Sequence, residues 1–172
     1  MTLAQLNALD ATSATREFLR CCGSTRWADK MTAARPYAIP DAMFVTADVI
    51  WAALDRQDWL EAFAAHPRIG AGKAGGAGGA GEAGRWSAQE QSGVAAAAQA
   101  VIDRLATKNQ DYESRFGYIF IVCATGRSAD EMLNMLDRRL ANDPDRELHI
   151  AAEEQRKITR LRLEKLLAEP SR

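Results

Sequence analysis

One of the two histidines in the chain, His66, occupies a position suited to proton transfer. Pro67 follows it directly, and a proline disfavours helical geometry in the residue before it. A helix carrying Leu60 and Phe63 must therefore end near His66, which frees the imidazole from the helix surface. Histidine titrates near neutral pH, so it can donate or accept a proton there. The alternative is a histidine that only hydrogen-bonds a helix end.

His149 lies in a charged helical segment and is interpreted as a surface or interface residue.

A second polar cluster consists of Ser87, Glu90 and Gln91. The spacing of Ser87 and Glu90 is that of a capping box, in which both side chains bond the first backbone N–H groups of a helix. Capping alone accounts for these two residues and leaves Gln91 unexplained. A helix N-terminus also attracts anions through its free N–H groups. The same place could therefore bind a substrate carboxylate, and capping and binding are compatible.

Arg162 is the third residue that could do chemistry. Leu148, Ala151, Ile158 and Leu166 form an apolar stripe at helical spacing, and Arg162 falls in the middle of it. An arginine on a buried face needs a partner, which is either a protein carboxylate or a ligand. The alternatives to ligand binding are a structural ion pair or a side chain that extends to solvent along the apolar surface.

Capping signals and apolar periodicity predict helices through most of the chain. We expect a short opening turn over residues 3–9, a helix capped by Ser13 that stops near Gly23, and a helix capped by Ser24 that ends before Pro36. Further helices are expected to begin at Pro40, Asp58, Ser87, Ser128 and Asp143-Pro144, with Glu131 completing a second capping box.

Two segments interrupt this pattern. Residues 70–84 are so rich in glycine that no regular element is expected, and we predict a surface loop that does not separate two domains. The loop contains G-x-G-x-x-G, but it lacks the preceding strand and following helix of a dinucleotide site, and nucleotide binding is rejected. The apolar run at residues 116–124 would be a buried strand by periodicity alone.

Composition excludes several classes of protein. The 172 residues have an apolar fraction of 47%, which suits one globular domain, and a net charge of −1 gives no reason to expect nucleic acid or an anionic membrane as partner. Cys21, Cys22 and Cys123 show no zinc-binding spacing, so no metal is expected. No signal peptide or membrane-spanning run is present in the sequence, and we expect a cytoplasmic protein with reduced cysteines.

Several short motifs, taken together and in order, resemble one family: the 2-oxo-4-hydroxy-4-carboxy-5-ureidoimidazoline (OHCU) decarboxylases of urate degradation. The matching stretches are Cys21-Cys22 with Trp27 and Arg35-Pro36; His66-Pro67-Arg68-Ile69-Gly70; Ser87-x-x-Glu90-Gln91-x-Gly93; Tyr112-x-x-Arg115-Phe116-Gly117-Tyr118; Phe120-Ile121-Val122-Cys123-Ala124; Arg139-Leu140-x-Asn142; Glu147-Leu148; and Ile158-x-x-Leu161-Arg162-Leu163. Each motif is weak, but the ordered set covers nearly the whole chain. The glycine-rich loop departs from the family, whose members usually carry a more mixed segment there.

The resemblance implies an all-α fold, which we take as one domain over residues 1–172 with about eight to ten helices. It places residues 116–124 within that all-helical architecture, and we adopt this over the strand. It also implies a homodimer without metal or organic cofactor, which decarboxylates OHCU to (S)-allantoin. His66 would be the catalytic proton donor, and by our hypothesis Glu90 orients it. The substrate pocket implied by the resemblance comprises Pro67, Ser87, Ala88, Gln89, Glu90, Gln91, Val122, Cys123, Ala124, Thr125, Gly126 and Arg162. The alternative function is a non-catalytic helical interaction module, in which these polar residues would be scattered or paired only for structure.

Overall fold

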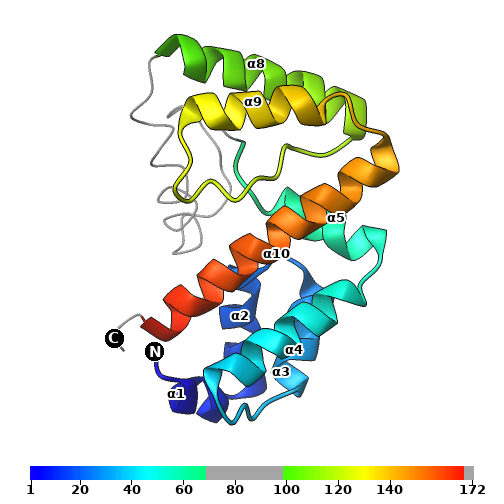
Figure 1. The fold of residues 1–172 in the computed structure, drawn as a ribbon. Coiled ribbons are helices and arrows are strands. Elements are labelled where there is room, and N and C mark those ends of the chain that lie inside the picture. The colour runs from blue at the N-terminus through cyan, green and yellow to red at the C-terminus, as the bar shows by residue number, and fades with distance from the viewer. Residues whose placement is uncertain (69–98, 169–172) are drawn as a thin grey trace. The chain divides into compact units, whose positions relative to one another are not determined.

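The computed structural model describes residues 1–68 and 99–168. Within these ranges the regular elements are eight α-helices and no strands, which confirms the predicted all-α class. They are α1 (Leu3–Ala8), α2 (Ala11–Cys21), α3 (Thr25–Ala33), α4 (Pro40–Ala52), α5 (Arg56–Ala64), α8 (Gln99–Phe116), α9 (Ala129–Arg139) and α10 (Pro144–Ala168) (Figure 1). None of these described helices is both long and apolar enough to cross a membrane. The predicted glycine-rich loop at 70–84 lies outside the described residues.

Short-range capping signals place most helix starts where the sequence predicts them. Ser24 accepts a hydrogen bond from the N–H of Trp27, at 3.3 Å, at the start of α3. Ser128 and Glu131 form the predicted capping box of α9, with reciprocal bonds of 2.7 and 3.2 Å. Helices α4 and α10 begin at the prolines predicted to open them. These starts depend on residues within one turn of the chain, which is why sequence reasoning finds them.

Two predicted starts are wrong by two or three residues. Helix α2 is capped by Asp10, whose Oδ1 accepts the N–H of Ser13 at 2.9 Å, so Ser13 lies inside the helix. Helix α5 begins at Arg56 rather than Asp58, and Asp55 Oδ1 accepts the N–H of Asp58 at 3.2 Å. In both cases an aspartate three residues upstream takes the cap, because its carboxylate bonds the free N–H groups and is attracted by the positive helix end.

The chain forms two compact units, which are described separately. The N-terminal unit comprises Met1–Ala62 together with Arg156–Arg172, and the central unit comprises Phe63–Gln155. Helix α10 crosses the division, so its first half belongs to the central unit and its second half to the N-terminal unit. Helix α5 crosses it at its last two residues.

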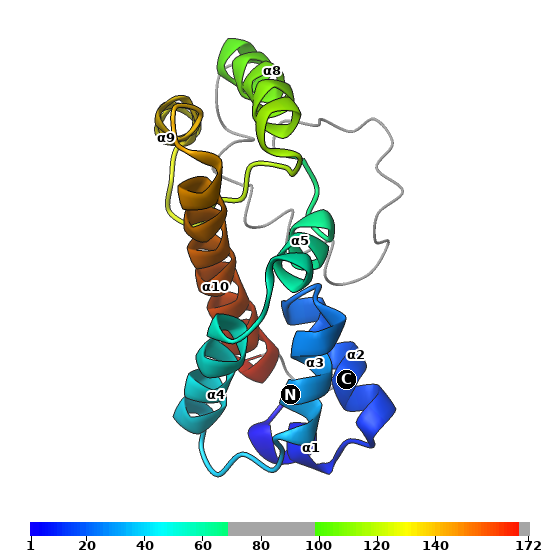
Figure 2. The same cartoon turned by 90° about the vertical axis from the view of Figure 1, so that its right-hand side faces the viewer.

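In the N-terminal unit, α3 packs against both α2 and α4 (Figure 2). Trp27 of α3 is fully buried, and its ring meets that of Phe18 edge-on with the centroids 6.0 Å apart. The indole Nε1 of Trp27 donates to the carbonyl of Ala47 on α4 at 3.2 Å, so the buried polar atom is satisfied. Burial of a large apolar side chain contributes about 1.5–3 kcal/mol. Trp27 therefore connects α3 with α2 and α4.

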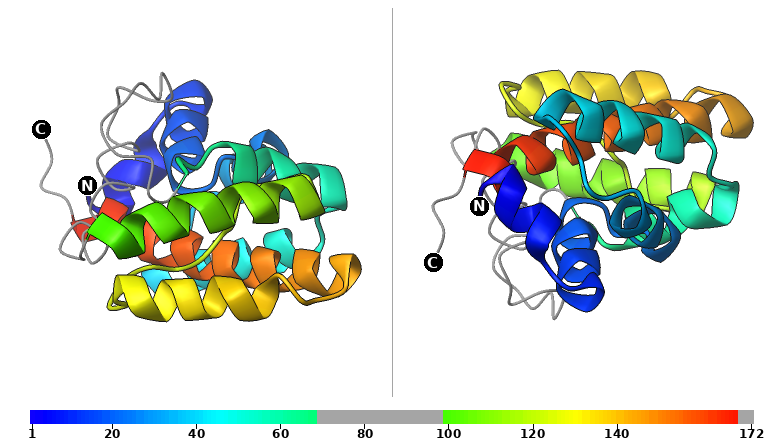
Figure 3. Two further views of the ribbon diagram at one scale, coloured as in Figure 1. Left: turned by 90° about the horizontal axis from the view of Figure 1, so that it is seen from above. Right: turned by 90° about the horizontal axis from the view of Figure 1, so that it is seen from below.

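In the central unit, α8 and α9 lie side by side (Figure 3), and an aromatic cluster fills the space beside α8. Tyr112 of α8 has the rings of Phe116, Tyr118 and Phe120 around it, with centroids 4.6 to 5.8 Å away. Phe63, on the last turn of α5, contacts Tyr118 at 5.3 Å. Helix α8 ends at Phe116, and residues 117–124 form neither helix nor strand. The strand favoured by periodicity is absent, because these apolar side chains pack into the cluster without a neighbouring strand.

Candidate active site

His66 lies just beyond the end of α5, as the sequence predicts. The helix ends at Ala64, and the backbone N–H of His66 donates to the carbonyl of Phe63 at 3.1 Å, which closes the last turn. The His66 side chain is half-buried, while Pro67 is exposed. Since Phe63 is part of the aromatic cluster, the backbone of His66 is held three residues from a fixed point of the central unit.

Arg68 ties the segment after His66 to α8. Its Nε and Nη2 donate to the two carboxylate oxygens of Glu113 at 2.9 and 2.7 Å, which is a bidentate ion pair. The hydrogen bond and charge of Arg68 hold the pKa of Glu113 below its ordinary value of 4.5. The pair therefore fixes the chain on the far side of Pro67 while His66 is fixed on the near side.

We expect the stabilisation from this ion pair to disappear in acid. The pKa of Glu113 is lowered in the folded protein, so its contribution is complete above 4.5 and is lost as the pH falls through the lower folded value. Wild type should melt at a higher temperature than Glu113→Gln at about pH 7, and the two melting temperatures should converge in acid. Thermal unfolding across this range measures the difference. A gap that stays constant into acid would show that the charge of Glu113 contributes nothing.

The predicted substrate residues Val122, Cys123, Ala124, Thr125 and Gly126 lie on the irregular segment between α8 and α9. Val122 and Ala124 are buried, Cys123 is half-buried, and the last two residues are exposed. The backbone turns back at this point, since the N–H of Arg127 donates to the carbonyl of Ala124 at 3.0 Å. The segment thus presents backbone groups at the surface of the central unit, next to a buried stretch.

Gly126 is the residue that allows this turn. It has a φ of +76°, a left-handed conformation that residues with a Cβ rarely adopt, and it stands third in the four-residue turn 124–127. A Cβ placed on Gly126 would meet nothing within 4 Å, so the requirement for glycine comes from the backbone and not from crowding. Gly126 was predicted from the family resemblance; a local signal that could also have indicated a turn is its position just before the capping box at Ser128.

A buried polar network, which the sequence does not reveal, holds the start of this segment. Arg139 Nη1 donates to the carbonyl of Ile121 at 2.7 Å, and its Nε donates to Glu147 Oε1 at 2.6 Å. Glu147 is fully buried and also accepts from the Tyr112 hydroxyl and, at 2.7 Å, from Asn142 Nδ2. Burying the ion pair is tolerable because each charge has several hydrogen bonds. The two motifs that contain Arg139 and Glu147 were noticed, but nothing in their spacing showed that the two side chains meet.

Arg162 is buried on α10 in the N-terminal unit, as its place in the apolar stripe predicts. It is 3% exposed and stands near Cys21 and Cys22, which are both fully buried. Burial raises the pKa of the Cys22 thiol to about 11 and also raises that of Cys21, while the charge of Arg162 acts in the opposite direction on both. The two thiols therefore stay protonated and unreactive.

The predicted site residues are distributed over both units, and some of them lie outside the described residues. His66, Pro67 and residues 122–126 belong to the central unit. The ring of Phe63, three residues before His66, contacts that of Tyr118, which stands four residues before Val122. Arg162 belongs to the N-terminal unit. Residues 87–91, which include the predicted orienting residue Glu90, lie outside the described residues. His149 is exposed on α10, in agreement with its interpretation as a surface residue.

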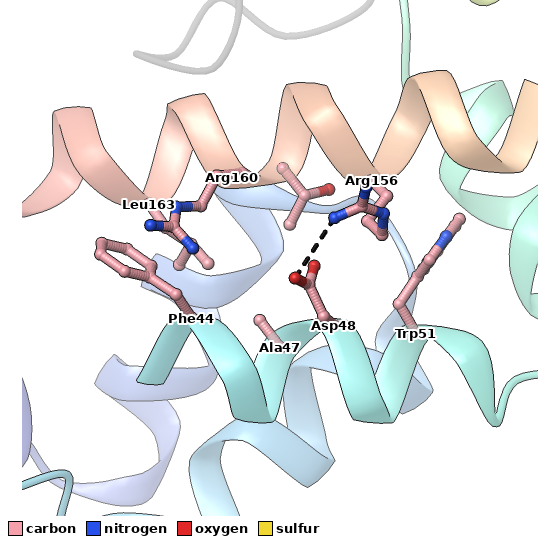
Figure 4. A pocket seen from close by; sticks show the side chains of 8 residues that line it. Phe44, Ala47, Asp48, Trp51, Arg156, Arg160 and Leu163 are labelled. Carbon is pink, nitrogen blue, oxygen red and sulfur yellow. Dashed lines mark hydrogen bonds and ion pairs between the residues drawn. The ribbon is translucent and has the colours of Figure 1, made fainter. Parts of the chain in front are cut away.

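A small cavity in the N-terminal unit lies between α4 and α10 (Figure 4). It is lined by Phe44, Ala47, Asp48, Trp51, Arg156, Thr159, Arg160 and Leu163. Its volume of about 10 Å³ holds about one water molecule. Arg156 pairs with Asp48 at 3.2 Å, and the Arg160 guanidinium stacks 3.7 Å from the centroid of the Phe44 ring. A cavity of this size cannot admit an organic substrate, and it contains none of the predicted site residues.

The chain resembles known proteins along nearly its whole length. Residues 7–164 match the family model described as OHCU decarboxylase. The chain is 40% identical over 157 residues to the uric acid degradation bifunctional protein TTL of Arabidopsis thaliana, an alignment that covers 91% of this chain and 48% of that protein. It is 35% identical over 83 residues to the 2-oxo-4-hydroxy-4-carboxy-5-ureidoimidazoline decarboxylase of Amia calva, covering 48% of this chain and 47% of the relative. The matched part of this chain thus spans about half the length of each of these two relatives.

A solved structure supports the same relationship. A crystal structure of OHCU decarboxylase in the presence of (S)-allantoin superposes with a TM-score of 0.76 and is 39% identical in sequence. The match covers 89% of this chain and 98% of that one.

Proposed function

This chain belongs to the OHCU decarboxylase family, and we propose on that basis that it converts OHCU to (S)-allantoin in urate degradation. The observation that carries the proposal is the solved OHCU decarboxylase of nearly the same extent, which is 39% identical and is matched over 98% of its length. That protein was crystallised with (S)-allantoin present, which is the product that the proposed reaction yields. The longer relative from Arabidopsis thaliana is named for uric acid degradation, which agrees with the same pathway.

The proposed reaction needs a proton donor and charge stabilisation. When the carboxylate leaves as CO2, the electron pair of the broken C–C bond remains on the ring carbon and is delocalised into the adjacent unsaturated ring. The substrate is therefore its own electron sink, and we propose a mechanism without cofactor. A proton must then be delivered to that carbon from one face. Preorganised donors around the ring stabilise the developing charge.

We assign proton delivery to His66 and its orientation to Glu90. Support for His66 comes from its half-buried position at the end of α5, fixed by Phe63 on one side and by the Arg68–Glu113 ion pair on the other. Pro67, residues 87–91, residues 122–126 and Arg162 form the proposed substrate pocket. The burial of Arg162 on an apolar helix face supports its place there, because a desolvated guanidinium binds an anionic group strongly.

We further propose that the chain acts as one catalytic domain, in a homodimer, in the cytoplasm. The single domain is supported by the family match, which extends over both compact units. The homodimer is supported by the resemblance to the family, and sedimentation velocity of the purified chain would test it directly. Nucleic acid and membranes are not proposed as partners, because the net charge of −1 offers them no attraction.

The proposed activity is tested by the optical activity of the allantoin formed. Urate oxidation generates OHCU in solution, and its spontaneous decay yields racemic allantoin. Adding this protein should accelerate the loss of OHCU and give an excess of the S enantiomer. Racemic product at the spontaneous rate would reject the activity and favour the non-catalytic interaction module.

Two glycines provide a matched test of the proposed role of the turn at 124–127. Gly126 and Gly117 have φ of +76° and +79°, and neither would meet an atom within 4 Å through an added Cβ. Alanine at either position should cost about 1–2 kcal/mol of stability from backbone strain alone. Only Gly126→Ala should also raise KM, since only it reshapes the proposed pocket. Equal KM values for the two variants, measured with melting curves, would remove the turn from substrate binding.

A further inference from the structure

The segment that carries residues 122–126 has no regular secondary structure to hold it. Residues 119–124 are neither helix nor strand, so no ladder of backbone hydrogen bonds fixes their direction. A hydrogen bond from a side chain on each of two helices attaches the segment instead. Arg139 of α9 binds the Ile121 carbonyl at 2.7 Å, and Glu154 of α10 binds the Cys123 N–H at 2.8 Å. The position of the segment is therefore set by side chains.

Glu154 is an unusual residue for this task because it is buried. It is 5% exposed, and its Oε2 accepts the Cys123 N–H. Burying a carboxylate is costly unless hydrogen bonds compensate it. A hydrogen bond from a backbone N–H to an ionised carboxylate is shorter and stronger than a neutral one. The Glu154 carboxylate therefore gives the backbone N–H of Cys123 a strong hydrogen-bond acceptor.

The bond from Glu154 acts directly next to the turn at 124–127. Arg127 Nε donates to the Cys123 carbonyl at 3.1 Å, and the Arg127 N–H closes the turn on Ala124. Cys123 is therefore held at both backbone groups: its N–H by α10 and its carbonyl by the far end of the turn. Within residues 1–68 and 99–168, the N–H groups of Ala124, Thr125 and Gly126 take part in no hydrogen bond.

We propose that Glu154 is a positioning residue for the substrate site: its hydrogen bond to Cys123 sets the direction in which the N–H groups of residues 124–126 face a bound substrate. Three consecutive N–H donors suit the carboxylate, or the oxo and hydroxy substituents of the ring, of an anionic and oxygen-rich substrate. In this role Glu154 acts through the backbone of Cys123 and does not itself bind the substrate. The inference rests on the proposed function, since the ligand of these donors is taken to be OHCU.

Three substitutions at Glu154 separate positioning from charge and from folding. Glu154→Gln keeps an oxygen that can accept the Cys123 N–H, so KM and kcat should stay within about threefold of wild type. Glu154→Met removes the acceptor, and Glu154→Asp keeps the charge but draws it back by one methylene. In both of these, kcat/KM should fall by about 10- to 100-fold, because displacement of binding groups by about 1 Å has effects of this size. Glu153→Gln, the exposed neighbour on α10, is the matched control and should change kcat/KM by less than about twofold.

The readouts are KM, the enantiomeric excess of allantoin and the hydrogen exchange of the Cys123 amide, each corrected for the folded fraction. Positioning predicts a higher KM, a lower excess and faster exchange in the methionine and aspartate variants, with the glutamine variant close to wild type. A purely structural role predicts fewer folded molecules with unchanged KM and excess, which would overturn the inference. If the methionine variant does not fold, the comparison of aspartate with glutamine decides.

An impaired glutamine variant beside a normal aspartate variant would show that charge matters and position does not. Wild type without any enantiomeric excess would reject the proposed function itself, and faster exchange would then show only that Glu154 holds the segment.

Discussion

Replacing His66 with asparagine is expected to lower the rate of enantioselective allantoin formation by about 10²- to 10⁴-fold, the usual worth of a positioned general acid. Asparagine is close to histidine in size and keeps hydrogen-bonding atoms, but it has no proton to give at neutral pH. The α5 terminus should survive, because the bond that closes it uses the backbone N–H of residue 66 and not the imidazole. Stopped-flow decay of OHCU with circular dichroism of the product measures the loss.

The other histidine gives the matched control. His149 is exposed on α10, so His149→Asn should leave both the rate and the enantiomeric excess unchanged. Helix content from far-ultraviolet circular dichroism should be the same in both variants. Retention of selective product formation by His66→Asn would remove His66 from the role of proton donor while leaving the family assignment intact.

The second large effect is expected on stability, at the buried pair of Arg139 and Glu147. Removing one member of a buried ion pair leaves an uncompensated charge and costs about 3–5 kcal/mol. Glu147→Leu leaves the buried Arg139 guanidinium without its carboxylate and removes the hydrogen-bond acceptor of Tyr112 and Asn142. For a protein of this size that loss corresponds to a fall in melting temperature of roughly 6–20 °C.

A double-mutant cycle identifies the cause of that loss. Arg139→Leu combined with Glu147→Leu should be less damaging than the sum of the single changes, because the pair is then removed as a whole. Asp137 pairs with Lys108 at 3.0 Å on the surface, with both side chains 38% exposed, and Asp137→Asn should cost less than about 1 kcal/mol. A Glu147→Leu variant as stable as Asp137→Asn would contradict the importance of the buried network.

The parts of the fold that could be predicted are those decided within one helical turn. Helix starts are indicated by the capping hydroxyls of Ser24 and Ser128 and by the prolines that open α4 and α10. The two wrong starts arise where two capping residues stand three positions apart and compete, as Asp10 and Ser13 do. Propensity ranks such residues almost equally, so the sequence contains little to separate them.

The candidate site also has features that local sequence predicts and features that it does not. Pro67 predicts where the helix before His66 ends, and the apolar stripe predicts that Arg162 is buried, because both depend on local rules. The path of residues 117–124 could not be predicted, since it is decided by an aromatic cluster and by side chains from two other helices. The pairing of Arg139 with Glu147 is equally invisible in the sequence, because these residues lie on different helices and meet only after folding.

The discontinuity of the N-terminal unit has a consequence for folding during synthesis. This unit needs both residues 1–62 and the second half of α10, so it cannot be completed until the whole of residues 63–155 has left the ribosome. The central unit is continuous and can fold first, while Phe44 of α4, which lines the small cavity together with Leu163 of α10, stays exposed until α10 is complete. Synonymous codons that slow translation near residue 155 would prolong that exposed interval without changing a single amino acid.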